Sequence, residues 1–88
     1  MTVAATIEDK LTRVFDPAAL RVIDESHLHA GHAGARPEGE THFRIEITAA
    51  AFVGQPRVAR HRLIYDALAD ELAGPVHALA LVTRAPGE

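Results

Sequence analysis

Residues 52–72, FVGQPRVARHRLIYDALADEL, carry the clearest helical pattern in the chain. Apolar side chains recur there at steps of three and four residues, which is the spacing of one helical face. The side chains on this face are Ile64, Tyr65, Leu68 and Leu72. His61 falls in the middle of the same stripe, whereas Leu63 points the other way. The pattern predicts a helix whose buried arc is wide or whose outer side is covered by a partner.

Two prolines set the ends of this helix. Pro56 can open it, because the N–H that proline lacks would have no intrahelical partner there and its φ is already helical. Gly74 and Pro75 end it, since glycine accepts a left-handed cap and proline cannot continue a helix. We therefore predict a helix over residues 56–72.

Three stretches around this helix have strand patterns. In His42–Thr48, apolar residues alternate with polar ones, which is typical of a strand with one buried face. Val76–Thr83 is nearly all apolar, as expected of a strand that is well covered. Leu20–Ser26 is shorter and mixed. A further helix is predicted over residues 3–15, where Thr6 and Asp9 have the spacing of a capping pair.

The order helix, strand, strand, helix, strand predicts the architecture. The first two strands should form an antiparallel hairpin, and the crossover through the 56–72 helix permits a parallel third strand. Both helices then cover one face of a three-stranded mixed sheet, which makes an α+β two-layer sandwich of αββαβ order. Eighty-eight residues suffice for one small core, so we predict a single domain over residues 1–88.

Composition restricts the possible functions. The net charge of −3 provides no general attraction to nucleic acid or to an acidic membrane. The chain has no cysteine, so it contributes no disulfide, no thiolate ligand and no thiol nucleophile. Charged residues interrupt the N-terminal stretch where a signal peptide needs an apolar core, and no apolar run is long enough to span a membrane. We expect a cytoplasmic protein.

Histidine is the first candidate for chemistry, with six residues in a chain of this length. His27, His29 and His32 lie in the segment 27–40, HLHAGHAGARPEGE, whose composition predicts a long loop. Imidazoles spaced this closely can share a zinc, iron, copper or nickel ion, although a complete zinc motif is absent. A solvated polar loop is the alternative.

The remaining histidines have structural alternatives as well. His77 starts the last predicted strand in phase with the core residues, so it is either a satisfied structural residue or a ligand at the rim of the sheet. His61 should help to hold the start of the helix, and His42 should hydrogen-bond locally.

Arginine is the second candidate. Arg57, Arg60 and Arg62 surround the predicted helix start, where the helix dipole would help them to neutralise phosphates. Surface salt pairs are an equally good explanation. Catalysis has little support, because Asp66 and Asp70 belong to a solvated helix face and Ser26 has no evident histidine or acid partner.

Six short motifs occur together and in order along the chain. They are Asp24-Glu25-Ser26, a histidine-containing loop, Glu40-Thr41-His42-Phe43, Phe52-x-Gly54, Arg60-His61-Arg62 and Val76-His77-Ala78-Leu79. This ordered set resembles the BolA family over nearly the whole chain. The resemblance implies an αββαβ fold similar to class II KH domains and a non-enzymatic role.

The resemblance also implies a partner and a cofactor. BolA proteins pair with monothiol glutaredoxins that carry a Cys-Gly-Phe-Ser motif, and the two proteins share a two-iron two-sulfur cluster with glutathione. By motif position, the ligands from this chain would be His77 and His29, with His32 and His27 as competitors in a loop that is longer than in many members. Family members are also described as DNA-binding transcriptional regulators, which would use the turn and helix at Gly54–Arg62. The second glycine of a KH-type Gly-x-x-Gly clamp is absent from this turn.

Overall fold

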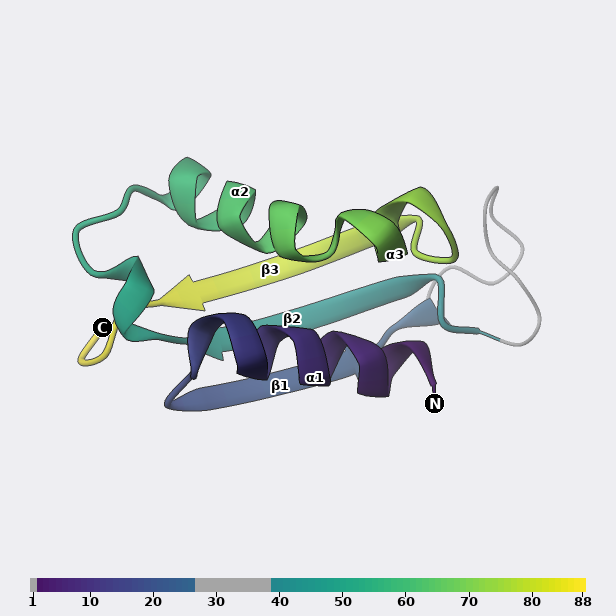
Figure 1. Ribbon diagram of the computed structural model, residues 1–88, viewed down its shortest axis with the longest axis horizontal. Coiled ribbons are helices and arrows are strands. Elements are labelled where there is room, and N and C mark those ends of the chain that lie inside the picture. The colour runs from purple at the N-terminus through teal and green to yellow at the C-terminus, as the bar shows by residue number, and fades with distance from the viewer. Residues whose placement is uncertain (1, 27–38) are drawn as a thin grey trace.

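The computed structural model describes residues 2–26 and 39–88, which form a three-stranded sheet and the helices packed against it (Figure 1). The main helices and strands follow the predicted order of helix, strand, strand, helix, strand. The elements are α1 (Val3–Phe15), β1 (Ala19–Asp24), β2 (His42–Thr48), the 3-10 helix η2 (Ala50–Phe52), α2 (Arg57–Ala67), α3 (Ala69–Ala73) and β3 (Ala78–Arg84).

The strand β2 lies at the centre of the sheet. It pairs with β1 in antiparallel register, so that Val22 lies opposite Ile45. It pairs with β3 in parallel register, so that Ile45 also lies opposite Leu81. The predicted hairpin and the predicted parallel crossover are both confirmed.

One face of the sheet forms the core. Phe43, Ile45 and Ile47 alternate along β2 and are almost fully buried, as the period-two pattern predicted. Side chains from both helices cover this face, namely Ile7, Leu11, Ile64 and Leu68. In Figure 1, α1 lies over β1 and β2 while α2 runs beside β3. The α+β two-layer sandwich is therefore confirmed, and its likeness to class II KH domains stays a prediction.

The structure corrects the predicted helix over residues 56–72 in four respects. Pro56 is the N-cap, with ψ of 161°, and the helix begins one residue later. The helix is also interrupted at Leu68, whose φ of −107° and ψ of 23° separate α2 from α3, although its N–H still donates to Ile64. Tyr65 is 42% exposed and so lies outside the buried stripe. Gly74 closes α3 with φ of −112°, which is not the left-handed cap expected.

The start of α1 also differs from the prediction. Thr2, rather than Thr6, caps this helix, because its hydroxyl accepts a hydrogen bond from the Ala5 N–H at 3.0 Å. The hydroxyl of Thr6 instead donates to the Thr2 carbonyl. None of the helices formed by residues 2–26 and 39–88 has the length and apolar content that crossing a bilayer requires.

Candidate functional site

His77 occupies the rim of the sheet at the end where β3 begins. It immediately precedes this strand and is exposed, so its ring faces solvent rather than the core. Its backbone N–H donates to the Thr41 carbonyl at 2.7 Å. The residue just before β3 is thereby fixed to the residue just before β2.

The described residues that flank the segment 27–38, namely Ser26 on one side and Gly39 on the other, lie at this same end of the sheet (Figure 1). On the outgoing side, Asp24 accepts hydrogen bonds from the N–H and the hydroxyl of Ser26 at 2.9 and 2.5 Å. On the returning side, the Glu40 N–H donates to the other oxygen of Asp24 at 3.1 Å. One carboxylate therefore joins the two stems of the segment.

Gly39 makes this junction possible. Its φ is +77°, and a Cβ atom there would lie 3.2 Å from an Asp24 oxygen, so both the conformation and the close approach favour glycine. The carboxylate of Glu40 then accepts from the Ala4 N–H in the first turn of α1. The returning stem is thus held by β1 and by α1.

Thr41 connects the stems to the histidines. It is fully buried, and its N–H donates to the Ser26 hydroxyl oxygen at 2.9 Å. Its own hydroxyl lies 2.8 Å from Nδ1 of His42. The His42 ring stacks against the ring of His77, with centroids 6.2 Å apart. His42, His77 and both stems consequently belong to one unit, which is joined by hydrogen bonds and by the stacking of the two imidazole rings.

The structure addresses the predicted metal ligands only in part. His77 lies beside the stems of the segment that carries His29 and His32, but these two residues, like His27, are outside the described residues. Within residues 2–26 and 39–88, no group of three or more histidine, aspartate or glutamate side chains has the arrangement of a metal site. The assignment of His29 and His32 as ligands stays a prediction.

The exposed imidazole of His77 is suited to serve as an iron ligand. An exposed imidazole at the rim of a sheet can enter the coordination sphere of a metal that is held mainly by another protein, and histidine replaces cysteine on iron in known two-iron two-sulfur centres. The chain has no thiolate to complete such a site by itself. Any cluster at His77 would therefore need sulfur ligands from a partner.

The predicted arginine site lies at the opposite end of the sheet, where α2 begins and β3 finishes (Figure 1). Arg57 and Arg62 are exposed, and neither forms an ion pair with any residue in the described ranges. His61 is half-buried and lines a shallow hollow with Val58, Arg62 and Tyr65. This histidine is therefore on α2, away from the His77 end.

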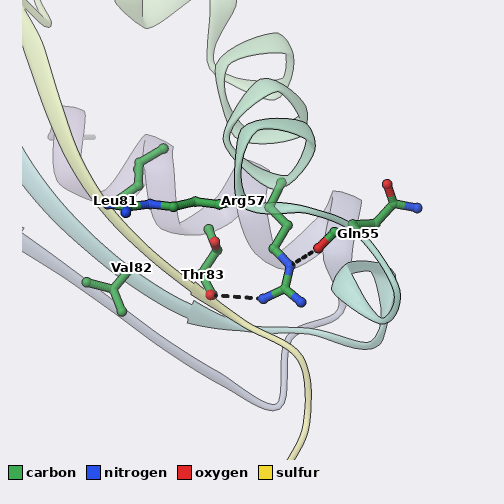
Figure 2. Close-up of a pocket in the computed structure, with 6 residues that line it drawn as sticks. Gln55, Arg57, Leu81, Val82 and Thr83 are labelled. Atoms are coloured by element: carbon green, nitrogen blue, oxygen red, sulfur yellow. Dashed lines mark hydrogen bonds between the residues drawn. The ribbon is translucent and has the colours of Figure 1, made fainter. Parts of the chain in front are cut away.

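Arg60 is already bound within the chain. Its Nε donates to the Gln55 carbonyl and its Nη1 to the Thr83 carbonyl, at 2.7 and 3.2 Å (Figure 2). The guanidinium also holds the carboxylate of Glu88 through two hydrogen bonds of 2.6 and 2.8 Å. This contact lowers the pKa of Glu88 to about 2 and raises the pKa of Arg60. Arg60 is thus not available to a phosphate while Glu88 occupies it.

The sequence analysis did not predict the roles of several residues that the structure places in these two regions. Ser26 has an acid partner in Asp24, which the sequence did not predict, but its buried hydroxyl serves the loop stems. The motifs containing Asp24 and Thr41 marked the right positions, yet nothing in their spacing indicated a shared network. Glu88 was part of a polar tail with no predicted function.

Comparison with known proteins agrees with the ordered motifs. A family model described as BolA-like protein matches residues 11–88. A protein of Sinorhizobium sp., described as an uncharacterized protein in the cobS 5' region, is 51% identical over 89 residues, which cover 100% of this chain and 96% of that protein. The Escherichia coli protein named DNA-binding transcriptional regulator BolA is 43% identical over 83 residues, which cover 94% of this chain and 75% of that protein.

Solved structures agree as well. BolA1 from Arabidopsis thaliana has a TM-score of 0.88 at 35% identity, covering 100% of this chain and 96% of that chain. Several plant and mammalian relatives are longer, and this chain spans between 23% and 61% of their length. Because a plant relative 41% identical is named chloroplastic, the cytoplasmic location stays a prediction.

Proposed function

Because the chain belongs to the BolA family, we propose that it is a non-catalytic iron–sulfur accessory protein that pairs with a monothiol glutaredoxin of the Cys-Gly-Phe-Ser type. In this proposal His77 and one histidine of the 27–38 segment, His29 or His32, ligate a two-iron two-sulfur cluster. The glutaredoxin and glutathione supply the sulfur ligands. The role would be in iron homeostasis, in cluster trafficking or in sensing.

A single observation carries the proposal. Both stems of the histidine-rich segment and His77 are tied to Thr41 at one end of the sheet. Residues about 50 positions apart in sequence thereby start from neighbouring anchor points. The described residues on either side of the segment thus lie at the same end of the sheet as the exposed His77, which supports a shared site.

The chemistry of the ligands supports a regulatory or transfer role. Replacing a thiolate by a neutral imidazole makes a cluster less negative and raises its reduction potential. A protonated imidazole cannot ligate, so the complex should weaken in acid. These residues hold and release the cluster in the proposal, and no step of it requires a nucleophile or a general base from this chain.

The test is reconstitution with the partner. The protein, a monothiol glutaredoxin, glutathione, iron and sulfide are mixed, and visible absorption and circular dichroism are compared with those of the glutaredoxin alone. We expect the spectrum of the mixture to differ from that of the glutaredoxin alone. His77→Ala should abolish this difference, and so should either His29→Ala or His32→Ala. His61→Ala is the matched control, because it removes a half-buried imidazole from α2. An unchanged spectrum with His77→Ala would contradict the ligand assignment.

DNA binding is the second candidate, and the Escherichia coli relative bears that function in its name. The observation in its favour is that Arg57 and Arg62, within the Gly54–Arg62 turn and helix, are exposed and carry no ion pair with the described residues. We expect binding to a DNA duplex to weaken steeply with salt. Arg57→Ala or Arg62→Ala should each reduce the salt slope by about one.

Arg13→Ala is the control for the DNA experiment. Arg13 is 77% exposed on α1, where it pairs with Asp9, so its removal changes the net charge equally. Equal losses of affinity for all three variants would indicate a general charge effect and contradict a site on α2.

A further inference from the structure

A groove of about 440 Å³ lies between the start of α2 and the strand β3. Polar side chains from the α2 end form one wall, and the last part of β3 forms the other. Its lining residues are Gln55, Arg57, Arg60, Leu81, Val82 and Thr83. Figure 2 shows the Arg57 side chain extending across the groove toward Leu81.

The groove has the electrostatics of an anion site. Two arginines line it, and no lining residue is acidic. Pro56 provides no side-chain cap for α2, and the first turn of this helix has no acidic residue. The partial positive charge of the helix start therefore adds to the charge of the guanidinium groups.

An anionic group already occupies part of this site. Glu88 presents both carboxylate oxygens to Arg60, which is the two-pronged geometry that a phosphate also adopts on arginine. The Ala85 N–H donates to the same carboxylate at 2.9 Å. The arginine side chain is only 11% exposed, whereas that of Glu88 is 46% exposed. Glu88 can thus move away while Arg60 stays in place, held by the Gln55 and Thr83 carbonyls.

We propose that this groove binds a phosphate oxyanion at Arg57 and Arg60, and that Glu88 is an internal competitor which must leave Arg60 first. The phosphate is either a free ion or part of a nucleic acid strand. The proposal depends on the DNA-binding function proposed above only if the phosphate belongs to a nucleic acid strand. The site lies at the far end of the sheet from His77, so it does not depend on the iron–sulfur proposal.

The experiment compares Glu88→Gln with the wild-type protein in two titrations, one with pyrophosphate and one with a single-stranded oligonucleotide. The Arg60 Nε–H resonance is followed by NMR, because this proton is held by the Gln55 carbonyl. Removing one carboxylate charge from a partly exposed pair should tighten binding about two- to fivefold. The control is Glu8→Gln, which makes the same chemical change at an exposed residue of α1 that has no ion pair with the described residues.

Each outcome decides the proposal. Tighter binding with Glu88→Gln than with Glu8→Gln, reversed when Arg57→Ala is added, supports it. A gain with pyrophosphate alone supports the site and argues against nucleic acid as its ligand. Equal behaviour of the two glutamine variants in both titrations overturns the proposal, because the contact between Glu88 and Arg60 would then have only a structural role.

Discussion

The imidazole rings of His42 and His77 stack with their centroids 6.2 Å apart and their planes 18° from parallel. His42 is the first residue of β2, and His77 immediately precedes β3, which runs parallel to β2. The pairing of these strands therefore brings the two rings together at the edge where both strands begin. Thr41 fixes this arrangement, since its carbonyl accepts from the His77 N–H while its hydroxyl contacts the His42 ring.

Thr41→Val should separate the role of this hydroxyl from the role of side-chain volume. The substitution keeps the shape but removes the contacts with His42 and Ser26. Loss of a buried hydrogen bond should lower the free energy of unfolding by about 1–3 kcal/mol. Urea denaturation measures this loss, and Thr41→Ser is the control that keeps the hydroxyl. Equal stability of the valine and wild-type proteins would contradict a structural role for the hydroxyl.

Ser26→Ala should loosen the stems of the histidine-rich segment. The Ser26 hydroxyl oxygen accepts from the N–H groups of Thr41 and His42, at 2.9 and 3.2 Å. Both amides lose this acceptor in the variant, so the free energy of the local opening that permits exchange should fall by about 1.4 kcal/mol or more. Their hydrogen exchange should then accelerate at least about tenfold. The amide of Ile45, in the middle of β2, is the internal control. Equal acceleration at all three amides would indicate global destabilisation instead.

The fold was predictable wherever one face of an element is buried. Alternation in β2 placed Phe43, Ile45 and Ile47 in the core, and the crossover length indicated the parallel third strand. The interruption at Leu68 was not predictable, because no glycine or proline marks it. Tyr65 matched the apolar spacing yet lies at the surface, since spacing alone does not define how wide the buried arc is.

The candidate site was less predictable than the fold. The predicted start of the last strand left His77 either as a structural residue or as a ligand at the rim of the sheet, and the structure shows it exposed just before β3. The network from Asp24 through Ser26 to Thr41 joins the end of β1 to the residue just before β2, so it depends on strand register, which no local pattern contains. The binding of Arg60 by Glu88 is similarly non-local, because these residues are 28 positions apart.

Ile45→Ala should test the central position of β2. Ile45 is fully buried between Val22 of β1 and Leu81 of β3. Removing its methylene and methyl groups leaves a cavity, and the free energy of unfolding should fall by about 2–5 kcal/mol. Val58→Ala is the control, because Val58 is 69% exposed on α2, and its substitution should change stability by less than about 0.5 kcal/mol. Comparable losses for the two variants would contradict the assignment of the core face.

Glu88→Gln should change how stability depends on pH. The contact with Arg60 lowers the pKa of Glu88 from 4.5 to about 2, so the folded protein favours the charged carboxylate more than the unfolded chain does. Its contribution is complete above about pH 4.5 and is lost as the pH falls toward 2.

The measurement is the difference in melting temperature between the wild-type protein and Glu88→Gln, taken from pH 7 to pH 2. The other carboxyl groups titrate in both proteins and cancel in the difference. We expect the wild-type protein to be more stable by a constant margin down to about pH 4.5, and the margin to shrink below it. Salt should reduce the margin at pH 7, because Glu88 is 46% exposed and its charge is screened. A margin that persists at pH 2 would mean that the ionised carboxylate is not what binds Arg60.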